Sequence, residues 1–94
     1  MTTPTKVTGS FATTANSGQI QLEKHFNLSL SGTFSATVII QRSFDGGSTW
    51  KDIKSYTAAI EETGIEPESD VFYRLSCTHS TGTVTYRLAQ TPYK

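Results

Sequence analysis

The side chains best able to do chemistry in this 94-residue chain are one cysteine and two histidines. Cys77 lies two residues before His79, whereas His25 is far away in the sequence. A thiol and an imidazole can form a nucleophilic pair, but such a pair also needs a group that orients the imidazole. The alternating pattern around Cys77 places it on the apolar side of a strand, where cysteine behaves as a small buried residue. We therefore expect a protein that is not an enzyme.

Acidic residues cluster between Glu61 and Asp70, around Gly64 and Pro67. Their spacing is irregular and lacks the Asp-x-Asp-x-Asp-Gly pattern of a calcium loop. The chain also has no zinc-ligand spacing, no glycine-rich phosphate loop and no nucleophile elbow. We expect these acids to lie in a solvated loop, with no metal and no cofactor. A weak cation site is the alternative.

The most specific motif is the segment from Ser43 to Trp50, which matches the Asp-box pattern Ser-x-Asp-x-Gly-x-Thr-Trp. Two adjacent glycines supply positive φ without steric cost, and an aspartate before them can accept hydrogen bonds from the backbone beyond it. In sialidase-type propellers this motif forms a folded turn away from the catalytic centre, so the resemblance implies a folding role. The residues expected to build the turn are Ser43, Asp45, Gly46, Gly47, Thr49 and Trp50.

The composition favours strands and argues against polyanionic partners. Lys and Arg together number 8, as do Asp and Glu, and the formal net charge is +0. Without a long-range field, neither nucleic acid nor an anionic membrane is an expected partner. Thr and Ser are frequent while Leu, Ala, Glu and Lys are sparse, which is typical of strand faces and turns. A single cysteine and the absence of an apolar segment of roughly 20 residues fit a soluble protein made in the cytoplasm.

Apolar and polar residues alternate over several long stretches, as in strands with one buried face. The longest runs from Ile20 to Ser31 and is broken only at Lys24, where we expect a bend or a passage between sheets. Ser31-Gly32 predicts a tight reversal, so that this strand pairs with Phe34–Arg42 as a hairpin. A second hairpin is predicted through the Asp-box, with its return strand reaching Tyr56. Further strands are predicted over 7–15, 71–77 and 83–90, with a short edge strand over 57–60.

About seven strands and no helical period predict an all-β fold, an antiparallel immunoglobulin-like β-sandwich. Residues 1–6 are expected to be a flexible arm and 7–94 the single domain, with a closed barrel as the alternative fold. The segment Ile65–Leu75 resembles the corner before the sixth strand of immunoglobulin-like sandwiches, which implies that the Tyr73 hydroxyl bonds to the upstream backbone. The predicted core consists of Phe11, Leu22, Phe26, Leu28, Leu30, Phe34, Val38, Ile40, Val71, Tyr73, Leu75, Val84, Tyr86 and Leu88.

Four stretches of the chain resemble small β-sandwich structural proteins of tailed bacteriophages. They are Leu28–Phe34, Val38–Trp50, Phe72–Leu75 and Gly82–Leu88. The resemblance implies a virion protein, and we expect a capsid decoration protein that stabilises the head. It would bind the major capsid protein or other virion subunits, as a homo-oligomer matched to the symmetry of the capsid.

Two alternatives to decoration remain open. One is a tail or fibre module. The other is a small carbohydrate-binding module that stacks sugars on Trp50, Tyr56 or Tyr93. Partner contacts are expected in the N-terminal arm and at an outward-facing aromatic of the strand that follows the acidic stretch. These residues are Thr2, Thr3, Pro4, Thr5 and Phe72.

Overall fold

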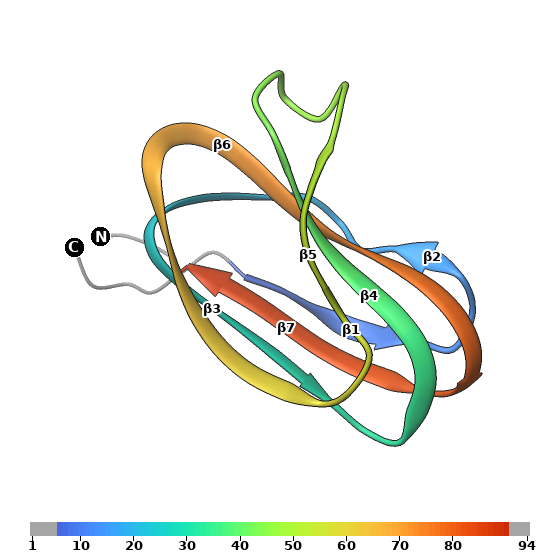
Figure 1. Cartoon of the computed structure of the whole chain (residues 1–94). Coiled ribbons are helices and arrows are strands. Elements are labelled where there is room, and N and C mark those ends of the chain that lie inside the picture. Colours follow the sequence, from blue (N-terminus) through green and yellow to red (C-terminus); the bar gives the residue numbers. More distant parts are fainter. Residues whose placement is uncertain (1–5, 91–94) are drawn as a thin grey trace.

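The computed structural model describes residues 6–90, which form seven β-strands (Figure 1). They are β1 (Lys6–Phe11), β2 (Ala15–Asn16), β3 (Ile20–Ser31), β4 (Phe34–Ser43), β5 (Lys51–Tyr56), β6 (Ile60–Gly82) and β7 (Val84–Gln90). Every pairing between these strands is antiparallel. Within the described residues, no helix is long and apolar enough to cross a membrane. The predicted all-β antiparallel sandwich of about seven strands is confirmed.

The strands form one hydrogen-bonded sheet that folds over into two layers. Its order is β1-β7-β3-β6-β4-β5, with β2 pairing alongside β6. Layer I contains β1, β7, the later part of β3 and the first part of β6, Ile60–Glu66. Layer II contains the later part of β6, from Val71, together with β4, β5, β2 and the start of β3. Both β3 and β6 therefore run through both layers (Figure 1).

The layer changes of β3 and β6 lie side by side. Their register shifts between Leu22, which faces Val71, and Lys24, which faces Glu66, so residues 67–70 bulge out of the pairing. Lys24 (φ 59°) and Asp70 (φ 64°) adopt left-handed backbone conformations that residues other than glycine seldom adopt. Such an irregularity bends a strand strongly. The predicted bend at Lys24 is confirmed.

The predicted hairpin between Ile20–Ser31 and Phe34–Arg42 is wrong. β3 pairs with β6 and β7, whereas β4 pairs with β5 and β6. The Gly32 turn therefore carries the chain from layer I to layer II. A turn signal specifies a reversal, but it does not specify whether the flanking strands pair in one sheet or face each other across a core.

The acidic stretch is also not a loop. Ile60–Glu66 pairs with Lys24–Leu30 of β3, because β3 leaves an open edge there once it has changed layers. Low strand propensity of glutamate is overridden by this tertiary pairing. The carboxylates of Glu61 and Glu62 have partners on neighbouring strands, the Ser29 hydroxyl at 2.6 Å and the Lys54 ammonium at 3.0 Å respectively.

Two crossings between the layers touch each other at one end of the sandwich. The Thr83 amide donates to the carbonyl of Thr33 over 3.2 Å, which joins the β6–β7 crossing to the β3–β4 crossing. Gly32 (φ +106°) and Gly82 (φ +83°) sit at this contact. A Cβ on Gly82 would overlap the carbonyl oxygen of Thr33, so only glycine fits there.

The core lies between the two layers. Every predicted core residue is buried except Phe34, which is partly buried and packs against the others. The rings of Phe26 in layer I and Tyr73 in layer II lie 5.0 Å apart, centroid to centroid, across the core. Ala89 lies on the same side of its strand as the exposed residues Thr85 and Arg87 but is only 2% exposed. The core also contains Ile20 and Tyr56, which were not among the predicted core residues, and Cys77, whose predicted burial is confirmed.

Candidate functional site

The Asp-box turn joins β4 to β5 and projects beyond the end of the sandwich (Figure 1). The Asp45 carboxylate accepts hydrogen bonds from the amides of Ser48 (3.1 Å) and Thr49 (2.9 Å). It also accepts hydrogen bonds from the hydroxyls of Thr49 (2.6 Å) and Ser43 (2.7 Å). Its pKa lies well below the usual range, because the Thr49 hydroxyl, the Thr49 amide and the Ser43 hydroxyl all stabilise the charged form.

Two left-handed glycines and two further hydrogen bonds complete this turn. Gly46 (φ 74°) and Gly47 (φ 103°) supply the left-handed backbone that the reversal needs. The Gly47 amide donates to the hydroxyl oxygen of Ser43 (2.9 Å), which is fully buried. The indole N–H of Trp50 donates to the Gly47 carbonyl (3.1 Å). All six predicted turn residues therefore lie in a single hydrogen-bonded turn, whose conformation is set by its own contacts.

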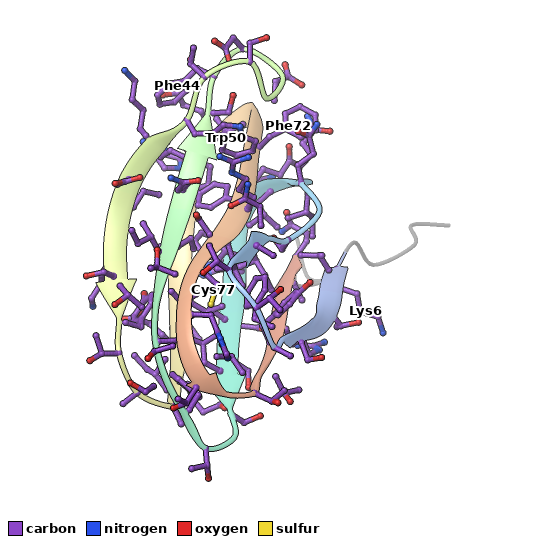
Figure 2. All side chains as sticks on the ribbon, turned by 90° about the vertical axis from the view of Figure 1, so that its right-hand side faces the viewer. Lys6, Phe44, Trp50, Phe72 and Cys77 are labelled. Atoms are coloured by element: carbon purple, nitrogen blue, oxygen red, sulfur yellow. The ribbon has the colours of Figure 1, made fainter. Side chains whose placement is uncertain are left out.

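The aromatic side chains of Phe44, Trp50 and Phe72 gather at this end of the molecule (Figure 2). The guanidinium of Arg42 lies 4.6 Å from the ring centre of Phe44, and that of Arg74 lies 4.4 Å from the ring of Trp50. Phe44 is 53% exposed. Phe72, the predicted partner contact, is half-buried and pairs in register with Ser43.

Phe44 was missed by the sequence analysis, although the motif contained a signal for it. Ser43 and Asp45 both direct their side chains into the hydrogen bonds of the turn. The side chain between them is therefore left to face solvent. An unspecified position between two turn-forming residues is where an exposed contact residue is expected.

A buried carboxylate holds the place where β6 changes layers. Glu66 is 1% exposed and accepts hydrogen bonds from the Tyr73 hydroxyl (2.6 Å) and the Glu68 amide (3.0 Å). It also forms an ion pair with Arg42 of β4. Tyr73 thus bonds to a side chain, and the expected bond to the upstream backbone is wrong, because the carboxylate of Glu66 lies within reach of the hydroxyl.

The electrostatics of Glu66 are those of a satisfied structural group. Desolvation raises the pKa of its carboxyl, but the hydrogen bonds from Tyr73, Glu68 and Arg42 lower it by more, so the net pKa lies below its ordinary value. Burial, followed by the hydrogen bond to Glu66, raises the pKa of Tyr73. A carboxylate that is charged, closed to solvent and fully paired holds the corner together and is not a general base.

A groove of about 240 Å³ opens between β5 and the first part of β6. Phe26, Leu28 and Ile40 contribute apolar lining, while Ile53 (48% exposed) and Ile65 (64% exposed) come from the two strands that border it. Both isoleucines were missed by the sequence analysis. Ile65 falls within the supposed acidic loop, and Ile53 is the extra residue of a bulge that alternation does not predict.

The groove also contains a polar cluster that is already paired. Glu62 accepts hydrogen bonds from the Tyr56 hydroxyl and from the ammonium of Lys54 (3.0 Å). Burial, and then the hydrogen bond to Glu62, raises the pKa of Tyr56. These hydrogen bonds link β5 to the first part of β6 and engage the hydroxyl of Tyr56 as a donor.

The candidate catalytic residues are not assembled into a catalytic arrangement. Cys77 is 1% exposed, and burial raises the pKa of its thiol, so it remains protonated at neutral pH. A ring nitrogen of His79 lies 2.7 Å from the Gly82 carbonyl, which ties this imidazole to its own turn. In the part of the chain that the structure describes, no three His, Cys, Asp or Glu side chains could hold a metal ion.

The aromatics proposed to stack sugars do not form one platform. Trp50 has Arg74 over its ring, and Tyr56 is buried at the far end of β5. Thr2, Thr3, Pro4, Thr5 and Tyr93 lie outside the described residues, and of the proposed arm only Lys6 is described, paired with Ala89. Comparison with models of known families, with curated proteins and with solved structures found no match.

Proposed function

We propose that this chain is a structural protein of a tailed phage, a decoration protein that binds the outside of the head and stabilises it. One observation carries the proposal: the Asp-box turn projects from the sandwich and presents Phe44, with its conformation fixed by Asp45. A preformed, exposed aromatic residue is typical of an anchor that inserts into a pocket of a partner.

The energetics suit a contact that is repeated many times. Full burial of a phenylalanine side chain contributes about 1.5–3 kcal/mol, and Phe44 is half-exposed, so one docked turn contributes about 1 kcal/mol. Such a contact is weak alone but gains strength when a symmetric assembly offers many copies of the site. The turn loses little conformational entropy on docking because its hydrogen bonds are already made.

The charge of the molecule supports recognition by shape and apolar contact. The formal net charge is +0. Arg42 and Arg74 lie against aromatic rings and bond to Glu66 and Gln41, so they do not form an open cationic patch. This arrangement favours a protein partner with a complementary pocket rather than a polyanionic partner.

The test uses purified protein and undecorated heads of the phage that encodes this chain. We expect saturable binding and a rise in the temperature at which the heads rupture. Phe44→Ala should reduce head binding about fivefold, because about 1 kcal/mol is lost and about 1.4 kcal/mol corresponds to a tenfold change. Ile65→Ala, a matched change at another exposed apolar side chain, should leave binding unchanged.

Three results would contradict this proposal. The first is no binding and no gain in head stability. The second is density for the protein confined to the tail in cryo-electron microscopy of the particle, which would favour the tail or fibre alternative. The third is equal binding by Phe44→Ala and the unchanged protein, which would remove the turn from the contact.

A further inference from the structure

The folded sheet ends in two edge strands, β1 and β5, and their edges differ in character. An edge strand presents unpaired backbone N–H and C=O groups, and natural proteins prevent unwanted pairing there with bulges and charges. The two edges therefore differ in how readily they could accept a further strand.

β5 carries the features that block pairing. Its register against β4 shifts between Ile40, which faces Lys54, and Gln41, which faces Asp52, so Ile53 is an extra residue. The charged side chains on either side of the bulge are both engaged, Asp52 by the Gln41 amide at 2.6 Å and Lys54 by Glu62 at 3.0 Å. An approaching strand would meet an irregular, charged edge.

β1 carries none of these features. It pairs with β7 without a shift from Lys6, opposite Ala89, to Phe11, opposite Val84. After Lys6 the strand has no charged residue, and the exposed side chains of Thr8 and Ser10 are small. Among the described residues β1 pairs with β7 alone, and it forms a side margin of the molecule (Figure 2). This regular edge is therefore open to strand addition.

We propose that the β1 edge pairs, antiparallel, with β1 of a second copy of this chain, joining the two copies of layer I into one sheet. Charge favours a second copy. A two-fold axis at Thr8 places Lys6 opposite Ser10 of the second copy, whereas an axis at Gly9 places Lys6 beyond the paired segment. In neither register do like charges face each other. The net charge of +0 adds no repulsion between copies. An acidic or basic partner would find no cluster of opposite charge along this edge.

The pairing does not depend on the function proposed above, because it requires no capsid. Six residues of β1 are available, which is less than a standard interface supplies, so the dimer is weak and concentration-dependent. In the dimer the two Asp-box turns belong to different copies, which would give one assembly two copies of the Phe44 contact.

The test is sedimentation equilibrium of the purified chain over a wide range of concentration. We expect a reversible monomer–dimer equilibrium. The double variant Thr8→Lys/Ser10→Lys should weaken dimerisation about tenfold, because in either register the new ammonium groups face each other or Lys6 across the two-fold axis. Lys51→Glu on β5 changes the net charge by the same magnitude and should leave the dimer unchanged.

Folding is checked separately by circular dichroism and thermal unfolding of each variant. The double variant should keep a strand spectrum and a cooperative transition, because Thr8 and Ser10 are exposed. A chain that stays monomeric at every concentration would overturn the proposal. So would a dimer that the double variant leaves intact, or one that Lys51→Glu weakens equally. Head binding by a strictly monomeric chain would overturn only the dimer.

Discussion

At the scale of single residues, Glu66 shows how this small domain retains a buried charge. Its carboxylate loses water where β6 changes layers, and Tyr73, Glu68 and Arg42 replace the lost hydrogen bonds. Removing one partner from such a cluster costs more than the cluster contributes in total, since the remaining groups stay buried without compensation. The residues therefore act as a unit.

Glu66→Gln is expected to lower the free energy of unfolding by about 3 kcal/mol, because it removes the charge that compensates Arg42. Tyr73→Phe is expected to lower it by about 1.5–3 kcal/mol, the range for a hydrogen bond to a charged group. The double variant should lose less than the sum. Tyr86→Phe is the control, because the Tyr86 hydroxyl has no hydrogen bond among the described residues, and it should change stability by less than about 0.5 kcal/mol. Urea denaturation of the four variants measures the effects, and strict additivity would contradict the network.

Asp45 should make the stability of the protein depend on pH. Its pKa is lower in the folded chain than in the unfolded chain, so its contribution is present above about pH 4 and is lost as the pH falls through the folded value. Asp45→Ala should lower the melting temperature at pH 7, and its difference from the unchanged protein should shrink below about pH 4. Asp45→Asn cannot titrate at this position either. The difference in melting temperature between this variant and the unchanged protein should therefore also shrink below about pH 4. A difference that stays constant from about pH 7 to about pH 2.5 would contradict this role.

At the scale of elements, the fold depends on how β3 and β6 change layers and how the chain crosses between them. The shift opposite Lys24 and the crossing glycines set which strands can pair. Gly82 and Gly46 offer a matched pair, because both have positive φ (83° and 74°) but only Gly82 lies against another backbone segment.

Gly46→Ala should cost about 1–2 kcal/mol of stability, the cost of a left-handed backbone with a Cβ atom. Gly82→Ala should cost clearly more, because its Cβ would also overlap the Thr33 carbonyl and disturb the contact between the two crossings. Thermal and urea unfolding of both variants test the order. Equal losses would show that the crossings move apart freely.

At the scale of the whole molecule, the two layers should not unfold separately. β3 and β6 supply strands to both layers, and one apolar core lies between them. Trp50 reports on the turn end of layer II, whereas far-ultraviolet circular dichroism reports on all strands. Their denaturation curves should coincide as a single two-state transition. Separate midpoints would indicate that the layers unfold independently. Because most strand pairs are distant in sequence, refolding is expected in milliseconds to seconds.

The alternation of apolar residues by itself determined much of the fold. Parity alone assigns the inward side of a strand, and it correctly buries Leu22, Val38, Leu75 and Leu88. The Asp-box pattern located a turn held mainly by local hydrogen bonds between Ser43 and Trp50, with Gln19 also donating to the Gly46 carbonyl from outside the turn. Local chemistry of this kind can be read from the sequence because every participant lies within a few residues of the others.

The tertiary structure decided what depends on residues far apart in the sequence. The reversal at Gly32 became a crossing between layers because β6 lies between β3 and β4 in the sheet. The acidic stretch became a strand because β3 offered it an edge, and Glu66 became a buried ion-pair partner because Arg42 and Tyr73 converge on it. The exposure of Phe44, Ile53 and Ile65 likewise followed from the packing around them. Sequence spacing specifies faces and turns, whereas pairing and burial are set by which distant segments meet, and only the folded chain determines that.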